Sequence, residues 1–438
     1  MRLSSVLFGT LVFISSICYA SAHPTLLIFS GSDWCIPCIN FEKNIISKPL
    51  FASYAEKNLI VKKADFPQRK KLSAKEINEN ETLAEKYNPN GIFPLVLVLD
   101  QEYKVIGTIN TNIHTPEELI QQIENTLQKP PLLEYRRKAL LMGSSFEFTI
   151  ICENERRAEY LLNAAEDEVK RIEALISEWD STSVISDINR QSGISPVSVS
   201  DEIYQLFHRS ITLSEVTHGA FDISFKGIEL YKFDQKEHIN FPDSSSIANA
   251  VQFIDYHSIQ LRPQGKVMLT KKGMAVGFGA SGKGYAADKV KQMLQREGVE
   301  AGVINASGDL TAWGKRTNGK QWKVGITEPD NPDHVKYWLP VENSAVATSG
   351  SYEKYFTYKG RRYAHIINPT TGLPVTDKKS VTVFSKSAEL SDAMATALFV
   401  LPVEEGLRLI ESLPDIKAIV IDEHNKVHYS KKLELIEY

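Results

Sequence analysis

The chain has 438 residues, 42% of them hydrophobic and 24% charged, which is long enough for two or three globular domains. A formal net charge of −4 without any Lys/Arg block argues against nucleic acid and the membrane surface as partners. Four cysteines do not indicate a disulfide-stapled scaffold, because a chain of this size can build its own apolar cores.

The first 22 residues have the pattern of a secretory signal peptide. Arg2 gives a positive start, an apolar run extends from Val6 to Ile17, and Ala20-Ser21-Ala22 fits a small-x-small cleavage site. The apolar run is short for a membrane span, and an uncleaved N-terminal anchor is the alternative. We therefore expect residues 1–22 to be removed and the mature protein to be periplasmic or otherwise exported.

Residues 23–130 are predicted to form a first domain. Thr115 caps its last helix, with Pro116 at the first helical position. Pro130 and Pro131 cannot continue that helix and mark a domain boundary. The expected order is β-α-β-α-β-β-α, with strands at 25–30, 59–64, 94–99 and 103–109, and helices from the CxxC motif to about 46, over 76–87 and from 116 onward.

A Cys35-Ile-Pro-Cys38 motif follows the first strand and opens a helix. A helix N-terminus stabilises a thiolate, so Cys35 is expected to be the exposed nucleophile and Cys38 the resolving thiol. No second CxxC or His/Cys pair lies nearby in the sequence, which argues against zinc. Both cysteines are candidate catalytic residues, and a degenerate domain used only for docking is the alternative.

With Trp34 before the motif and this order of elements, residues 23–129 resemble the thioredoxin superfamily, which has an α/β fold. The resemblance implies a reversible dithiol with a thiol–disulfide partner. It also implies a cis-proline at Phe93-Pro94, facing the dithiol. The direction of electron flow stays open, since an exported dithiol can be a reductant or an oxidant.

Residues 131–438 are predicted to form an α+β domain, with strands in its core and helices around it. Cys152 ends an alternating, strand-like segment, where a small buried apolar role is expected. A long helix is expected over about 155–179. Its core-facing stripe consists of Leu161, Leu162, Ala165, Val169, Ile172, Leu175 and Ile176.

Two small-residue turns are candidate phosphate sites. The segment 276–288 is glycine-rich and runs into a helix whose N–H groups suit phosphate, with Lys283 as a possible counter-charge. It is not a P-loop, because Gly284 stands where that motif needs Ser or Thr. The segment 305–309 follows a short strand and forms a second turn of this kind. For the first turn, simple packing is the alternative.

Further along, three polar groups suggest chemistry. Thr348-Ser349-Gly350 supplies hydroxyls, and His365 follows as a candidate base, although a hydrogen-bonded structural histidine is the alternative. Asp392 and Thr396 lie four residues apart on one face of a predicted helix. Two such oxygen ligands suit Mg²⁺, and a cap-like hydrogen bond is the alternative.

The order of the motifs in this second part resembles the FAD:protein FMN transferase (ApbE-type) family, from about residue 135 to the C-terminus. The resemblance implies an α+β flavin-transferase domain. The motifs that carry it are Leu141-Met142-Gly143, Gly219-Ala220-Phe221-Asp222, residues 282–288, Ser307-Gly308-Asp309, Thr348-Ser349-Gly350, His365 with residues 368–372, and residues 392–396.

The same resemblance implies FAD as the substrate and Mg²⁺ as the metal. The carbonyl of Ala280 and the side chains of Asp392 and Thr396 would hold Mg²⁺. His365 would be the base for a Thr or Ser hydroxyl of an exported acceptor protein, whose oxygen attacks the FMN-side phosphorus and displaces AMP. The residues implied to bind FAD are Met142, Trp179, Ala220, Phe221, Asp222, Lys283, Gly284, Asp288, Ser307, Gly308, Asp309, Thr348, Ser349, Gly350, Ile367, Asn368, Thr371 and Gly372.

Four positions depart from the family pattern. Gly277 stands where the family usually has an acidic residue, Ser351 and Asn368 each replace an aspartate, and Ser307 replaces the first of a pair of glycines. The first alternative function is hydrolysis of FAD to FMN and AMP by the same site. The others are a flavin-binding or docking protein without catalysis, and a protein whose main activity is thiol–disulfide exchange.

Overall fold

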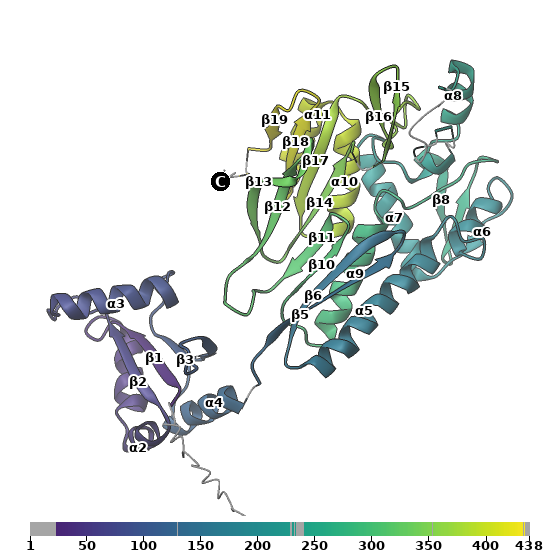
Figure 1. Cartoon of the computed structure of the whole chain (residues 1–438). Coiled ribbons are helices and arrows are strands. Elements are labelled where there is room, and N and C mark those ends of the chain that lie inside the picture. The colour runs from purple at the N-terminus through teal and green to yellow at the C-terminus, as the bar shows by residue number, and fades with distance from the viewer. Residues whose placement is uncertain are drawn as a thin grey trace, which may run out of the picture. The chain divides into compact units, whose positions relative to one another are not determined.

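The computed structural model describes residues 23–128, 130–227, 230–231, 233, 241–352, 354–431 and 433. The chain divides into two compact units, residues 1–131 and 132–438 (Figure 1). The expected signal peptide, residues 1–22, lies outside the described residues. In the described part of the chain, no helix is both long and apolar enough to cross a membrane.

The first unit is a four-stranded sheet with helices on both faces. Its strand order is β2-β1-β3-β4, with β1 parallel to β2 and the other neighbours antiparallel. Leu26 and Ile28 of β1 pack with α2 and α4, whereas Leu27 and Phe29 pack with α3. The elements are β1 (Thr25–Ser30), α1 (Ile36–Phe41) continued by a π-helical turn (Glu42–Ile46), α2 (Pro49–Asn58), β2 (Ile60–Asp65), α3 (Ala74–Tyr87), β3 (Leu95–Leu99), β4 (Val105–Ile109) and α4 (Pro116–Gln128).

The predicted strands and helices of this unit are confirmed, apart from one omission. The expected order lacks α2 and is wrong in that respect. Pro49 occupies the first helical position, and Phe51 and Ala55, four residues apart, form the buried face that fixes this helix. The Phe93–Pro94 peptide bond is cis, as expected.

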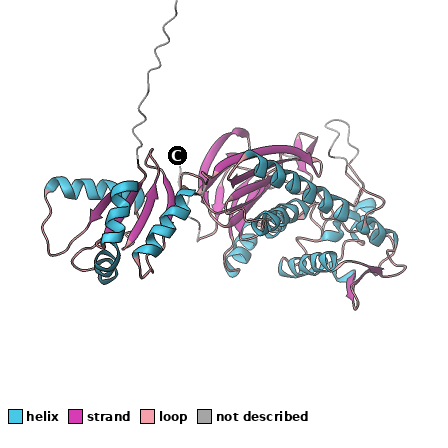
Figure 2. Cartoon of the chain, turned by 90° about the horizontal axis from the view of Figure 1, so that it is seen from below, coloured by secondary structure: helices cyan, strands magenta, loops and turns pink. Residues whose placement is uncertain are grey.

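An eight-stranded antiparallel sheet forms the centre of the second unit (Figure 1). Helices α5, α9 and α10 pack on one of its faces, where Phe146, Phe148 and Ile150 of β6 belong to their core. The opposite face is covered by the β12–β13 ribbon, whose Trp322 and Val341 pack against the sheet. Figure 2 shows the helices of this unit gathered beside its strands. The sheet order is β19-β18-β17-β14-β11-β10-β6-β5.

Smaller elements complete the second unit, including the three-stranded sheet β7-β9-β8 and the hairpin β15–β16. Its strands are β5 (Leu133–Leu141), β6 (Ser144–Cys152), β7 (Val197–Ser198), β8 (Ile259–Arg262), β9 (Lys266–Leu269), β10 (Gly302–Ala306), β11 (Asp309–Trp313), β12 (Trp322–Glu328), β13 (Asn331–Val341), β14 (Ser344–Gly350), β15 (Tyr355–Tyr358), β16 (Arg361–Ala364), β17 (Lys378–Ser385), β18 (Lys417–Asp422) and β19 (Val427–Tyr429). Its α-helices are α5 (Glu155–Ile176), α6 (Val184–Arg190), α7 (Asp201–Val216), α8 (Ser244–Val251), α9 (Gly282–Arg296), α10 (Ala388–Val400) and α11 (Val403–Ser412).

The long helix α5 carries the expected apolar stripe, which packs into the main core. It ends at Ile176 rather than at Trp179, because Ser177 leaves the helical region with a ψ of 121°. Cys152 is a buried free cysteine, as predicted.

Helices α9 and α10 cross at very short range. A Cβ on Gly284 would lie 2.2 Å from the carbonyl oxygen of Ala388, so only glycine allows this approach. One turn further along α9, the Asp288 carboxylate accepts hydrogen bonds from Ser387 Oγ at 2.7 Å and from Glu389 N at 3.0 Å. Asp288 thereby caps the start of α10, which fixes the two helices that carry the central motifs.

Candidate functional site

The start of α9 connects motifs that are far apart in the sequence. Lys283 forms an ion pair with Asp309, which follows the β10–β11 turn. The backbone N–H of Gly284 donates to Asp392 Oδ2 of α10 at 3.2 Å. The structure thus brings three of the predicted segments together around the first turn of one helix, where the helix dipole and a lysine favour an anion.

The Lys283–Asp309 pair is held in a buried setting. Ser307 and Gly308 turn the chain with φ values of 58° and 106°, and the N–H of Gly308 donates to Asn305 Oδ1 at 2.9 Å. The side chain of Asp309 is only 3% exposed. Burial raises the pKa of the Asp309 carboxyl, and the Lys283 ammonium opposes that shift. Asp309 therefore positions the Lys283 ammonium beside the turn.

The residues expected to hold a metal offer oxygen atoms of the right kind. Asp392 is buried, and Thr396 lies one turn further along α10. Next to Ala280, Ser281 Oγ is buried and is the single such side-chain atom in the described residues that finds no hydrogen-bond partner. No group of three or more His, Cys, Asp and Glu residues in the described chain could hold a metal. A cation here would depend on carbonyl, hydroxyl and single carboxylate oxygens, which fits Mg²⁺ rather than zinc.

His365 lies just after strand β16 as a half-buried, neutral imidazole. Its Nδ1 lies 3.2 Å from the carbonyl oxygen of Lys354, which also accepts the backbone N–H of His365. Since a carbonyl only accepts, Nδ1 carries the proton and Nε2 keeps a lone pair. Burial lowers the pKa of His365 to about 4; the bond to Lys354 opposes this, and the charges of Lys354 and Lys283 add to it. The ring can therefore accept a proton at neutral pH.

The turn after His365 is organised by Asn368. Its side-chain oxygen accepts the N–H groups of Thr370 at 2.9 Å and Thr371 at 3.2 Å, and its carbonyl accepts that of Gly372. Tyr231 donates its hydroxyl to the Gly372 carbonyl at 3.0 Å. An amide oxygen makes both side-chain bonds as well as a carboxylate would, so the Asn at this position preserves the turn.

A polar pocket of about 520 Å³ lies over the sheet beside these turns. It is lined by Ser307, Gly308 and Thr348 of the predicted set, together with Lys354, which sequence reasoning had not singled out. Thr348 Oγ1 lies 2.9 Å from Thr382 Oγ1 on the neighbouring strand. The pocket is thus rich in hydroxyl and backbone polar groups, which suits a polar, phosphate-bearing ligand.

Other residues predicted to bind FAD have structural roles in the fold. Phe221 is 1% exposed, and both oxygens of the buried Asp222 accept hydrogen bonds, from Ser224 and from the backbone of Tyr256. Asp288 caps α10, and Gly284 permits the helix crossing. For these four, packing explains the residue type before any ligand is considered.

Met142 lies beside the glycine-rich segment, and Trp179 follows the end of α5. A Cβ on Gly282 would lie 3.7 Å from Met142 Cε and 2.9 Å from Ile176 Cδ1, close to the end of α5. Met142 has a φ of 50° and donates its N–H to Glu173. Trp179 is 79% exposed, with Lys226 Nζ 3.4 Å from the centre of its ring. The indole ring of Trp179 is thus an accessible aromatic surface of the kind on which other ring systems stack.

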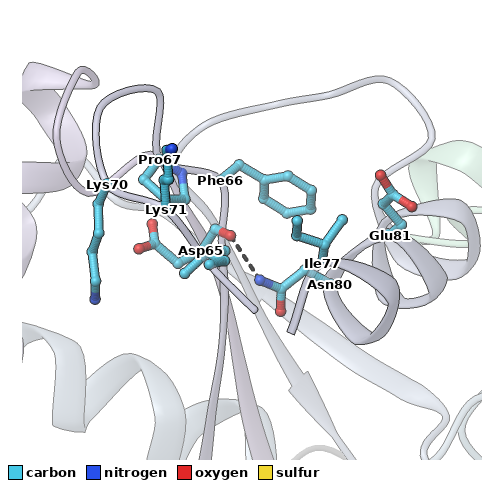
Figure 3. A pocket seen from close by; sticks show the side chains of 9 residues that line it. Asp65, Phe66, Pro67, Lys70, Lys71, Ile77, Asn80 and Glu81 are labelled. Carbon is cyan, nitrogen blue, oxygen red and sulfur yellow. Dashed lines mark hydrogen bonds between the residues drawn. The ribbon is translucent and has the colours of Figure 1, made fainter. Parts of the chain in front are cut away.

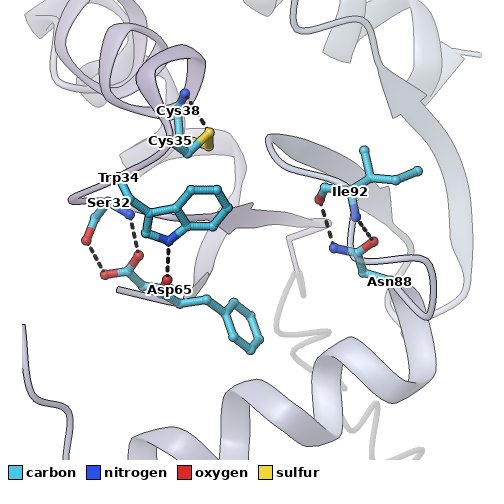
Figure 4. The surroundings of a disulfide bond; sticks show 8 residues. Ser32, Trp34, Cys35, Cys38, Asp65, Asn88 and Ile92 are labelled. Carbon is cyan, nitrogen blue, oxygen red and sulfur yellow. Dashed lines mark hydrogen bonds between the residues drawn. A yellow bond between two sulfur atoms is a disulfide. The ribbon is translucent and has the colours of Figure 1, made fainter. Parts of the chain in front are cut away.

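The first unit holds Cys35 and Cys38 as a disulfide at the start of α1 (Figure 4). The expectation of an exposed Cys35 is wrong, since it is 6% exposed and Cys38 is 2% exposed. Their neighbours in the sequence, Trp34 and Ile36, are accessible, at 38% and 71%. Apolar side chains are therefore exposed on both sides of Cys35 in the sequence.

Hydrogen bonds tie the cysteine turn to the segment after β2. Ser32 donates its N–H and hydroxyl to Asp65, and Trp34 Nε1 donates to the carbonyl of Phe66 at 2.7 Å (Figure 4). Asp33, missed from the sequence, accepts three backbone N–H groups of residues 68–70 at 2.7–2.9 Å. The segment so positioned lines a pocket of about 470 Å³ with Ile77 and Asn80 of α3 (Figure 3).

The two units carry different kinds of site. The second unit combines a polar pocket, a lysine at a helix start and a neutral histidine, which are features of a ligand-binding enzyme domain. The chain belongs to the ApbE family, whose model matches residues 142–420.

Similar proteins agree with this membership. An FAD:protein FMN transferase of Treponema pallidum is 29% identical over 320 residues, covering 68% of this chain and 87% of that protein. One from Klebsiella pneumoniae is 30% identical over 305 residues, covering 69% and 93%. The solved ApbE protein of Thermotoga maritima is 28% identical, with a TM-score of 0.64 over 68% of this chain and 97% of that one. The second unit thus has the ApbE flavin-transferase fold.

We predict that Lys283 stabilises the fold through Asp309. Lys283→Met leaves a buried carboxylate without its cation, and we expect it to lower the free energy of unfolding by about 2–3 kcal/mol. The double variant Lys283→Met/Asp309→Asn should recover most of this loss, since a neutral amide needs no counter-charge. Urea unfolding followed by tryptophan fluorescence measures it, because four of the five tryptophans lie in the second unit.

The matched control is Lys386→Met, whose partner Asp415 is 65% exposed. An exposed pair contributes little, so we expect a change under about 1 kcal/mol there. Equal effects of the two lysine substitutions would contradict the buried-pair account.

Proposed function

We propose that the second unit transfers FMN from FAD to a Thr or Ser hydroxyl of an exported acceptor protein and releases AMP. The observation that carries the proposal is the neutral His365, whose bond to Lys354 leaves Nε2 ready to take a proton. The acceptor oxygen forms a bond to the FMN-side phosphorus, and the bond from that phosphorus to the bridging oxygen breaks. The hydroxyl proton passes to His365 Nε2, and the AMP leaves with the bridging oxygen.

The start of α9 provides positive charge that stabilises the negatively charged pyrophosphate of FAD. Lys283, positioned by Asp309, provides an ammonium at the positive end of the α9 helix dipole. The carbonyl of Ala280 and the side chains of Asp392 and Thr396 would hold Mg²⁺, which when bound adds positive charge against the pyrophosphate oxygens. The buried hydroxyl of Ser281 supports the assignment, since its polar partner is missing from the described protein atoms.

For the first unit we propose a thioredoxin-like thiol–disulfide domain. The sheet order, the Cys35–Cys38 disulfide at a helix start and the cis-proline at 94 support it. A partner thiolate attacks Cys35 Sγ, the S–S bond breaks, and Cys38 leaves as a thiolate. A second partner thiol then resolves the mixed disulfide, so the partner is oxidised and this pair reduced; the reverse sequence reduces a partner. The pattern of residues 1–22 supports export as the setting.

The transfer itself is tested with the mature protein, FAD, Mg²⁺ and the exported protein fraction of the same cells. We expect a flavin-fluorescent band that survives denaturing electrophoresis, with AMP released in equal amount. Chelation with EDTA and the variant Asp392→Ala should both reduce the rate by at least about a hundredfold, because the pyrophosphate loses a cation. AMP without a band would instead indicate hydrolysis, and bound FAD with neither product would indicate a flavin-binding protein.

The base assignment predicts an unusual pH profile. Because burial lowers the pKa of His365 to about 4, the imidazole stays neutral and active from pH 8 down to about pH 5. An ordinary histidine would lose activity around pH 6.5. We expect kcat/KM, measured by AMP release with acceptor, to show no His-type limb near 6.5, and His365→Ala to lose about a hundredfold or more.

The exposed His208 of α7 provides the matched control, and His208→Ala should leave the rate unchanged. An acid limb centred near pH 6.5 that disappears in His365→Ala would overturn the buried-base account. Full activity of His365→Ala would remove it as the base.

The two units should act independently, because each has its own core. Cys35→Ser abolishes the disulfide, and we expect flavin transfer by this variant to stay within about twofold of the parent protein. Thiol–disulfide exchange, followed as oxidation of a dithiol peptide substrate by the Cys35–Cys38 disulfide, should be lost. A large drop in flavin transfer would show that the sulfur chemistry supports the transferase.

A further inference from the structure

We propose that Glu178, directly before Trp179, is a specificity-determining residue of the flavin-nucleotide site: its carboxylate accepts a hydrogen bond from the polar edge of a ring stacked on Trp179. The inference rests on the proposed FAD chemistry and names the residue that recognises one of the two ring systems of that substrate. It comes from three observations on this chain.

The first observation is the space beside Gly277. This glycine does not have a positive φ, so its backbone does not require glycine. A Cβ there would lie 3.2 Å from Cδ and Oε1 of Glu178 and 3.4 Å from Cβ of Lys226. That distance is tighter than ordinary van der Waals contact. The missing side chain at 277 therefore makes room for the Glu178 carboxylate.

The second observation is the position of this carboxylate. Gly277 stands in the glycine-rich segment that leads through Ala280 to Lys283, the proposed pyrophosphate site. The end of α5, just before Glu178, also reaches that segment through Ile176. A carboxylate repels phosphate, so it does not serve the pyrophosphate itself. It lies where a ring joined to that pyrophosphate would extend.

The third observation is the pairing of a shielded acid with an exposed aromatic. Trp179 is 79% exposed, and the ammonium of Lys226 lies over its ring. Burial raises the pKa of Glu178, while its own backbone N–H and the charge of Lys226 lower it. Lys226 thus lies over the Trp179 ring and opposes, through its charge, the upward shift in the pKa of Glu178.

The ligand chemistry follows from this pair. The oxygens of an ionised carboxylate accept hydrogen bonds, and so does the carbonyl oxygen of a protonated carboxyl group. Either form therefore offers an acceptor to a flat heteroaromatic ring with an N–H donor on its edge. FAD offers two, the exocyclic amine of adenine and the imide N–H of the isoalloxazine. Both share the chemistry, and binding measurements with the half-molecules distinguish them.

The test is equilibrium binding of FAD, ADP and FMN by calorimetry, using the full mature chain with Mg²⁺. Glu178→Ala removes the acceptor, and we expect FAD to bind about tenfold to a hundredfold more weakly, the loss typical of a hydrogen bond to a charged group. ADP alone should weaken in parallel if the ring is adenine, and FMN alone if it is the isoalloxazine. The control is Glu404→Ala, an exposed glutamate of α11, with all three affinities unchanged.

A second pair of variants separates recognition from folding. Gly277→Ala forces the Glu178 carboxylate to move, and in the parent protein it should weaken FAD binding by about fivefold or more. In the Glu178→Ala background the same change should have little further effect, because the crowded group is gone. Melting temperatures within a few degrees of the parent would show that these losses are not unfolding.

The outcomes are distinct. If the parent binds and transfers FAD while Glu178→Ala binds FAD, ADP and FMN within twofold of the parent, the inference is wrong and the proposed function stands. Equal weakening of ADP and FMN, or a loss of melting temperature that accounts for the weaker binding, would also overturn it. Failure of the parent chain to bind FAD would overturn the proposed function and the inference together.

Discussion

The close crossing of α9 and α10 is the constraint on which the rest of the second unit depends. Helices normally pack with side chains between them, at axis distances of about 8–10 Å. Here Gly284 lets the backbone of α9 approach the carbonyl of Ala388 directly. The N–H of Gly284 then reaches Asp392, and Asp288 closes the start of α10. An oxygen-bearing face of one helix is thereby fixed against the N-terminal turn of another.

That arrangement places ionisable side chains where little water reaches them, and the fold offsets the cost of burial for each side chain. Asp309 is buried but paired with Lys283, and His365 is half-buried and neutral. Both solutions follow from the cost of an unpaired buried charge. They also suit the proposed group transfer, since a positioned ammonium and a neutral imidazole are what a pyrophosphate and an attacking hydroxyl require. Ser281 is the exception among the described residues, as a buried hydroxyl without a partner.

Much of the fold could be predicted because it follows local rules. The stripe of α5 and the strand around Cys152 show clear periodicity, and both are confirmed. Helix α2 was missed although Pro49, Phe51 and Ala55 mark it, because ten residues give only a short pattern. The site was harder to predict from the sequence, since its motifs indicate which residue types matter but not what each residue contacts. Asp222 and Asp288 are acidic for reasons of turn and cap geometry, and no spacing in the sequence distinguishes this from ligand binding.

The residues that sequence reasoning overlooked share a physical reason. Lys354 acts through its carbonyl, Asp33 through three backbone amides, and Glu178 through the space left by Gly277. Each depends on a partner distant in the chain or on the backbone, which residue identity does not encode. Glycine is the most informative of these partners. At 284 it admits a helix and at 277 it admits a carboxylate, so the absence of a side chain determines in both places which group stands beside the proposed nucleotide.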